Sequence, residues 1–119
     1  MIWLSEINNY LGSFIECFYD QNLTKPLMLS EDGKNSIQIN KTVEAGKTET
    51  FEVYIINRFE HEFHIENIDS IDEDLSVVPD VSVLFPNQIA KLKIVFAPKN
   101  DRFVGLDTVF TISGRFIIS

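Results

Sequence analysis

Short runs in which apolar and polar residues alternate fill the chain from about residue 35 to residue 118. A period of two is typical of β-strands that bury one face and expose the other. Turn-forming residues, such as those at 44–47 and 86–87, separate the runs. The predicted strands cover residues 48–57, 62–66, 75–77, 81–85, 91–96 and 106–113, with residues 116–118 extending the last one.

Several short strands at this spacing, with turns between them, predict an all-β fold. We expect a single β-sandwich of about seven strands, with two sheets that each expose one face to solvent. This sandwich domain is assigned to residues 30–119. Residues 1–29 are assigned to an N-terminal extension of uncertain structure, which packs on the sandwich or on a partner.

The extension carries two conflicting patterns. Ile7, Leu11, Phe14 and Phe18 have the spacing of one helix face, whereas the aromatic-rich run up to residue 19 favours a strand. We therefore predict a strand over residues 13–19, and a short helix before it remains open.

Aromatic residues of this extension are candidates for a partner interface. The chain has ten Phe, three Tyr and one Trp, which is more aromatic surface than a core of this size requires. Apolar side chains outside a closed core often mark a protein–protein contact. The candidate interface residues are Trp3, Tyr10, Phe14 and Phe18.

The formal net charge of −8 narrows the classes of partner. It argues against a nucleic-acid backbone or an anionic membrane surface as the main partner. No apolar run reaches the roughly 20 residues that a membrane-spanning helix needs. The first basic residue is Lys25, so the chain does not begin with a secretory signal pattern, and we expect the protein to be made in a cytoplasm.

The acidic residues are concentrated in one segment. Residues 60–80 hold eight Asp and Glu and no Lys or Arg, so the charge of this segment equals that of the whole chain. Four of these acids cluster in a predicted loop and form a candidate acidic surface: Asp69, Asp72, Glu73 and Asp74. We expect this loop to be solvated and available to a basic partner. The spacing does not match an EF-hand, which leaves cation binding open.

Residues capable of chemistry are few and scattered. His61 and His64 are separated by an odd number of positions, so a strand would point them to opposite faces and they would not share a metal. Cys17 lies among apolar and acidic residues, which predicts a buried thiol with a raised pKa. The sequence contains no nucleophile-elbow or phosphate-loop motif. We therefore expect no enzymatic activity, no cofactor and no metal.

Several motifs resemble those of one branch of immunoglobulin-like sandwiches. They are a strand ending in Asn (VYIINR, 53–58), a short strand ending in Pro (LSVVP, 75–79), a turn (LFPNQ, 84–88) and a further strand (IVFAP, 94–98), followed by ISG near the end. This pattern resembles the major-sperm-protein and ASH-type domains. The resemblance implies the sandwich fold and a role in scaffolding and partner binding, and it brings no catalytic residues with it.

These features predict a non-enzymatic structural or interaction protein whose partners are other proteins, either a larger assembly or copies of itself. Small acidic sandwiches resemble accessory components of tailed-phage virions, such as head decoration, neck or tail proteins, so the leading prediction is a role in such a virion. Two alternatives remain open. One is a cytoplasmic adaptor domain that binds a partner peptide along a sheet edge, and the other is a carbohydrate- or small-ligand-binding sandwich.

Overall fold

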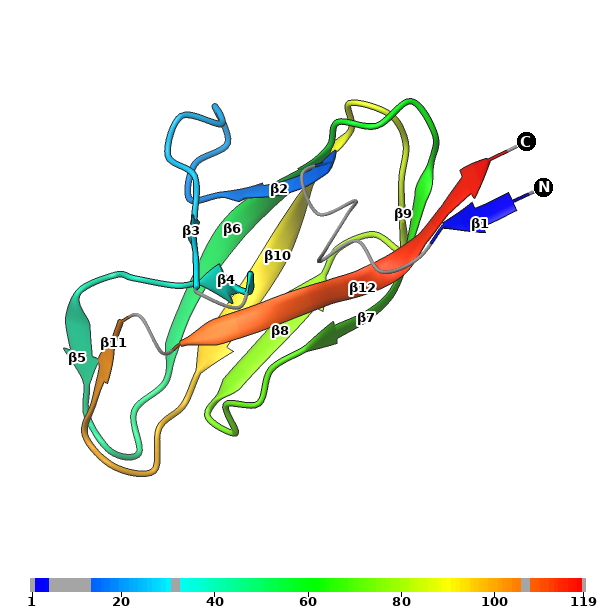
Figure 1. Ribbon diagram of the computed structural model, residues 1–119. Helices are drawn as coiled ribbons and strands as arrows, with labels where there is room; N and C mark the ends of the chain where they lie inside the picture. The colour runs from blue at the N-terminus through cyan, green and yellow to red at the C-terminus, as the bar shows by residue number, and fades with distance from the viewer. Residues whose placement is uncertain (1, 5–13, 31–32, 106–107, 119) are drawn as a thin grey trace.

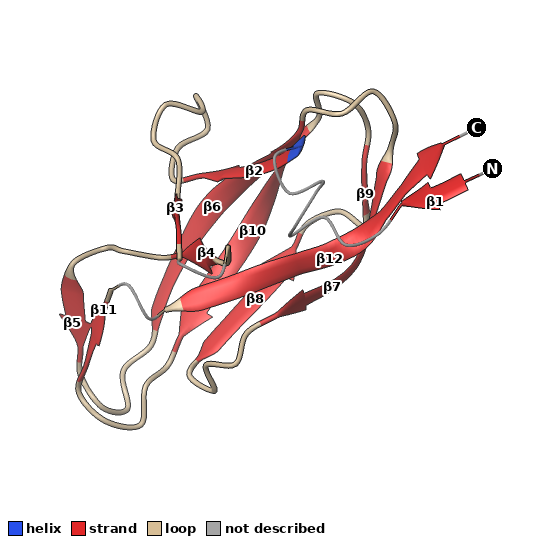
Figure 2. Cartoon of the chain, in the orientation of Figure 1, coloured by secondary structure: helices blue, strands red, loops and turns tan. Residues whose placement is uncertain are grey.

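The computed structural model describes residues 2–4, 14–30, 33–105 and 108–118, and these residues form an all-β protein without an α-helix (Figures 1 and 2). In chain order the strands are β1 (Ile2–Leu4), β2 (Ile15–Phe18), β3 (Met28–Leu29), β4 (Asn35–Ser36), β5 (Lys41–Val43), β6 (Glu49–Asn57), β7 (Phe63–Asp69), β8 (Leu75–Pro79), β9 (Val83–Leu84), β10 (Ile89–Phe96), β11 (Arg102–Val104) and β12 (Val109–Ile118).

Two antiparallel sheets form the layers of the sandwich. The six-stranded sheet has the order β3-β4-β12-β7-β9, with β1 paired to the far end of β12. The four-stranded sheet has the order β2-β6-β10-β8. Strands β5 and β11 pair only with each other among the described strands, and this two-stranded ribbon projects at one end of the molecule (Figure 1). The predicted all-β fold is therefore confirmed, and its layers are those of a β-sandwich.

The core lies between the two sheets and follows the alternation seen in the sequence. On β10, Ala90, Leu92, Ile94 and Phe96 are buried, whereas the residues between them are exposed or half-buried. Burying one such aliphatic or aromatic side chain contributes about 1.5–3 kcal/mol to folding. On β10 the two-residue period therefore fixes which face of the strand joins the core.

Among the described residues of the predicted N-terminal extension, three strands pair with strands of the sandwich. β2 pairs with β6, which places Cys17 opposite Ile55, and β1 pairs with β12. β3 likewise continues the six-stranded sheet through β4. The predicted strand over residues 13–19 is confirmed by β2. The short helix considered before it falls on residues 5–13, which lie outside the described part of the chain.

The number of strands differs from the prediction of about seven. The long alternating runs are confirmed as β6, β7, β8 and β10, and the run predicted at 81–85 contracts to the two residues of β9. The segments predicted at 106–113 and 116–118 are joined in one strand, β12, which passes through Gly114 without a break. Twelve strands result in the described residues, because several edge strands are too short to show an alternation.

A β-bulge between β7 and β12 changes which side chains face the interior. Ser113 pairs with Asn67, whereas the next residue, Gly114, pairs with Ile65, so Glu66 is the extra residue on β7. Ile65 and Ile68 lie opposite Gly114 and Ile112, which are two positions apart on β12. Both isoleucines therefore face the core, although an odd separation would place them on opposite faces of a regular strand.

A buried Asn57 at the end of β6 ties together three segments. Its side-chain NH₂ donates to the carbonyl oxygens of His61 (2.9 Å) and Leu84 (3.0 Å), and its side-chain oxygen accepts from the N–H of Phe59 (2.9 Å). The Asn57 carbonyl also accepts from the N–H of Asn87 (2.7 Å). Because every buried polar group of this side chain has a partner, Asn57 is a structural junction.

Candidate functional site

β7 and β8 lie next to each other in different sheets (Figure 1). A groove of about 460 Å³ opens along this side of the sandwich. We call it the edge groove. Its floor is formed by five apolar residues: Ile65, Ile68, Val77, Pro79 and Val81. Its rim is formed by four polar residues: Glu66, Asn67, Asp80 and Ser82. The bulge described above supplies the floor, because it turns both isoleucines of β7 toward the interior.

One wall of the groove is β8, the last strand of the four-stranded sheet. On its inner side β8 bonds to β10: the N–H of Asp80 donates to the Lys91 carbonyl (3.1 Å), and the N–H of Ala97 donates to the Asp74 carbonyl (2.9 Å). In an antiparallel ladder the backbone groups of alternate residues point to the same side. Residues 74, 76, 78 and 80 therefore bond toward β10.

The residues between them direct their backbone groups away from β10, toward the groove. The N–H of Leu75 donates to the Asp72 carbonyl (3.1 Å), and Pro79 has no N–H. Within the described part of the chain, the outward edge of β8 therefore offers one backbone donor, the N–H of Val77. The carbonyl groups of Leu75, Val77 and Pro79 lie along the same edge.

The other wall is the distal half of β7. β9 pairs with β7 only at Phe63 and His64, and the N–H of Ile65 donates to the Ser82 carbonyl (2.9 Å). Beyond this bond, residues 67–69 pair with β12 on one side and have no strand on the other side within the described residues. Two strand edges therefore remain open on either side of the apolar floor.

The rim of the edge groove is acidic. The described residues that line it include Glu66 and Asp80 and no Lys, Arg or His. Glu66 lies 3.0 Å from the Arg115 Nε, but both side chains are about half exposed, at 48% and 47%. Exposed ion pairs of this kind contribute only about 0–1 kcal/mol to stability, so the Glu66 carboxylate can exchange Arg115 for another cation.

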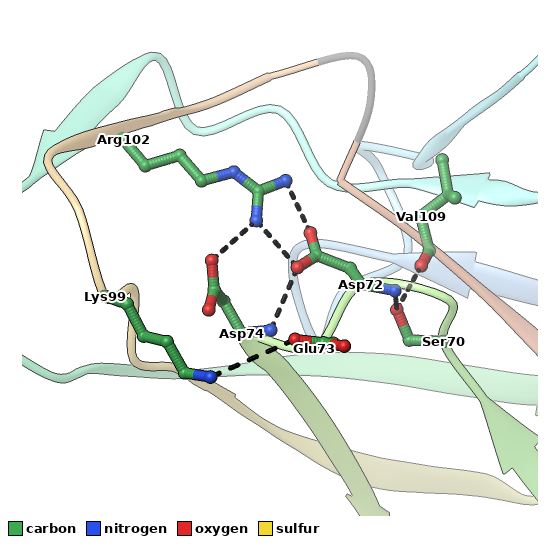
Figure 3. Close-up of polar contacts among 7 residues, drawn as sticks. All are labelled: Ser70, Asp72, Glu73, Asp74, Lys99, Arg102 and Val109. Atoms are coloured by element: carbon green, nitrogen blue, oxygen red, sulfur yellow. Dashed lines mark hydrogen bonds and ion pairs between the residues drawn. The ribbon is translucent and has the colours of Figure 1, made fainter.

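The predicted acidic loop is organised differently from the expectation, around Arg102 on β11 (Figure 3). The guanidinium donates two hydrogen bonds to Asp72, each 2.6 Å long, and a third to Asp74 at 3.0 Å. The guanidinium carbon also lies 5.1 Å from the centre of the Phe96 ring. The Asp72 side chain is only 6% exposed, so the prediction that it forms a solvated acidic surface is wrong.

The environment of Asp72 determines its ionisation. Burial acts to raise the pKa of this carboxyl group, but hydrogen bonds from Arg102 and from the N–H of Asp74, together with the charge of Arg102, lower the pKa below its ordinary value. Asp72 is therefore ionised at neutral pH and is neutralised inside the protein by Arg102.

The two remaining acids of the candidate surface do face solvent. Asp69 accepts two hydrogen bonds from the side-chain NH₂ of Asn67, at 2.8 and 2.7 Å. Glu73 is 85% exposed and lies 4.0 Å from the Lys99 ammonium. Among the described residues, no three His, Cys, Asp or Glu side chains are placed to hold a metal ion together. The guanidinium of Arg102 occupies the position between Asp72 and Asp74.

The four candidate interface residues have different positions. Phe18 is 6% exposed, so the prediction that it contacts a partner is wrong. Phe14 is half-buried, with its ring 4.5 Å from that of Phe59. The backbone of Trp3 pairs with residue 117 in the β1–β12 ladder. Tyr10 lies outside the described residues.

The scattered chemical residues do not form a site. Cys17 is buried at 5% exposure, and burial, followed by the nearby charge of Glu16, raises the pKa of its thiol to about 12. His61 precedes β7 and lies 3.8 Å from Glu60, whereas His64 lies on β7 at 3.3 Å from Glu62. The predicted buried thiol is confirmed. No helix in the described residues is long and apolar enough to cross a membrane.

The sequence contained one signal for the edge groove that its pattern analysis did not use. Pro79 ends an alternating run, and proline within a strand is confined to edges and bulges because it cannot donate to a ladder. This feature marks β8 as an edge strand. The groove itself also depends on the position of β7 relative to β8, which the pattern alone does not contain.

Comparisons with known proteins add no family. No protein-family model matches the chain, and searches of curated proteins and of solved structures find no significant match. The resemblance to the major-sperm-protein and ASH-type sandwiches therefore stays a prediction from the motifs, and the function is argued from the geometry of the edge groove.

Proposed function

We propose that the protein is a non-enzymatic interaction module that binds an extended segment of a partner protein along β8, in the edge groove. The observation that carries the proposal is the pair of open strand edges on either side of an apolar floor. This corresponds to the adaptor alternative of the sequence analysis, whereas a place in a phage virion stays a prediction from the sequence.

Strand addition supplies both affinity and selectivity at such an edge. A peptide in β conformation bonds to the free backbone groups of an edge strand, and alternate side chains enter the adjoining groove. At β8 the N–H of Val77 and the flanking carbonyl groups supply the backbone bonds, while the floor contacts the apolar parts of the side chains that face the groove. Because Pro79 has no N–H, it cannot donate to an added strand, and this confines pairing to the middle of β8.

The proposal is tested with a peptide of about seven residues in which Val and Thr alternate, a length typical of a strand. We expect titration of the ¹⁵N-labelled protein to shift the amide signals of β8 and distal β7 and to slow hydrogen exchange at Val77. The matched variants are Val77→Pro, which removes the outward N–H, and Val77→Ala, which keeps it.

Val77→Pro should abolish binding while leaving the β8–β10 ladder intact, because the Val77 N–H does not bond to β10. Val77→Ala should weaken binding only partly, by reducing the apolar floor. Equal binding by Val77→Pro and the parent protein, at unchanged folding, would contradict strand addition. Absence of binding by extended peptides of any charge would overturn the proposed function as a whole.

A further inference from the structure

We infer that the segment bound in the edge groove is a basic peptide, in which Lys or Arg residues alternate with apolar ones. This inference rests on the proposed function and specifies its partner. It follows from the distribution of charge around the groove, and the chemistry of the floor and the rim agrees with it.

The rim of the groove is negative. Among the described residues that line it, Glu66 and Asp80 are charged and none is Lys, Arg or His, and the ion pair of Glu66 with Arg115 is half exposed. Residues 60–80 contain eight acids and no Lys or Arg. Arg102 pairs with two of them, Asp72 and Asp74, in a partly buried cluster, and its single positive charge balances one of these two carboxylates. The six others are outside this cluster: Glu60, Glu62, Glu66, Asp69, Glu73 and Asp80. A segment with positive charge would therefore meet a complementary surface.

An apolar floor beside an acidic rim suits long basic side chains. Lys and Arg have aliphatic stems that cover apolar surface while the charged end stays at the boundary with water. In the edge groove, such a stem would lie on Ile68 or Val77, and its charged end would reach Glu66 or Asp80 on the rim. An acidic side chain at the same place would meet like charge.

Charge also argues against a second copy of the chain as the occupant. Pairing of β8 with β8 of another copy would bring two acidic rims together, and like charges at close range are destabilising. A free basic segment of another protein carries no such penalty. The proposal therefore commits to a heterologous basic peptide.

The test compares three peptides of about seven residues, in which Val alternates with Lys, with Thr or with Glu. Binding is measured by isothermal titration calorimetry at low and high salt. We expect the Val–Lys peptide to bind at least about tenfold more tightly than the Val–Thr peptide, and we expect this advantage to shrink at high salt. The Val–Glu peptide should bind weakest.

The variant Glu66→Gln/Asp80→Asn tests whether the rim carries the preference. Asn at residue 80 keeps an oxygen that can accept from the Lys91 N–H, as Asp80 does at 3.1 Å. We expect this variant to lose about fivefold in affinity for the Val–Lys peptide and none for the Val–Thr peptide. The matched control, Glu73→Gln, removes a charge of the same segment outside the groove and should change neither value.

The outcomes separate the two proposals. Equal affinity for the Val–Lys and Val–Thr peptides would overturn the basic-peptide inference and leave the proposed function standing. Failure of all three peptides would overturn both. A dimer seen by sedimentation and lost in Val77→Pro would assign the open edge to a second copy, which also overturns the inference.

Discussion

Gly114 on β12 lies directly against the carbonyl oxygen of His64 on β7. A β-carbon placed on residue 114 would overlap this oxygen and would also press into the Phe63 ring. The contact lies at the bulge, where β12 and β7 change register between residues 113 and 114. The close approach of the two backbones, and with it the orientation of Ile68 into the edge groove, therefore requires glycine at this position.

We expect Gly114→Ala to lower the free energy of unfolding by about 2–3 kcal/mol, because the methyl group meets backbone that can move only with its strand. Urea denaturation measures the change. Gly46→Ala is the matched control: Gly46 has a positive φ of 78° but open space around it, so this variant should lose only about 1–2 kcal/mol. Equal losses in the two variants would contradict the steric argument.

Removing Arg102 should expose the cost of burying Asp72. Arg102→Met keeps much of the contact with Phe96 but leaves the Asp72 carboxylate, at 6% exposure, without its bidentate partner. We expect a loss of about 2–3 kcal/mol, below the 3–5 kcal/mol of a fully buried pair because Arg102 is 26% exposed. Lys99→Met, which removes an exposed pair, should change stability by less than about 0.5 kcal/mol.

The lowered pKa of the Asp72 carboxyl group should make the stability of the fold depend on pH. Its pKa is lower in the folded state than in the unfolded chain, so its contribution is present above the unfolded value, near pH 4, and is lost as pH falls through the folded pKa. Stability measured from pH 6 to pH 2 should show this loss. In Arg102→Met, burial alone would raise that pKa, so the difference between variant and parent should shrink below about pH 4. A constant difference across this range would contradict the assignment.

Substituting the buried Asn57 should lower the free energy of unfolding. Asn57→Ala leaves the N–H of Phe59 and the carbonyls of His61 and Leu84 without side-chain partners, and each such loss costs about 1–3 kcal/mol. We expect a total loss of about 3 kcal/mol in thermal or urea unfolding. Asn67→Ala, an exposed control, should stay within about 0.5 kcal/mol, and a comparable loss there would argue against the junction.

The Cys17 thiol should be inert in the folded protein. With its pKa raised to about 12 and 5% exposure, it carries almost no thiolate at pH 8. Iodoacetamide should label it only after unfolding in denaturant, as followed by mass spectrometry. The raised pKa also means that stability is lost as pH rises above the unfolded value, near 8.5, toward 12. Rapid labelling without denaturant would contradict the buried position.

Alternation predicted the parts of the fold in which burial depends on one strand alone. β10 follows its two-residue period throughout and β6 follows it as far as Ile55, and the apolar neighbours of Cys17 indicated its burial. The pairing of β2 with β6 joins residues some forty positions apart, for example Cys17 and Ile55, and no local pattern encodes that register. A local pattern therefore assigns these N-terminal strands to an extension.

The candidate site depended on two effects that a local pattern cannot show. One is the bulge, because an extra residue at 66 cancels the odd separation of Ile65 and Ile68 and places both on one face. The other is long-range charge pairing. Asp72 belongs to an acidic run in the sequence, but its partner, Arg102, lies thirty positions further along, so a local count of charges assigned the carboxylate to solvent.

The ladder between β1 and β12 has a mechanical consequence. The two strands are antiparallel, with Ile2 opposite Ile118, so the chain enters and leaves the sandwich at the same end of one ladder (Figure 1). A force that pulls these two ends apart acts on one backbone pair at a time, from Ile2–Ile118 inward to Leu4–Phe116. β1 would therefore detach from β12 by unzipping at low force, whereas the core strands β6 and β10, which lie in the other sheet, would not bear the load first.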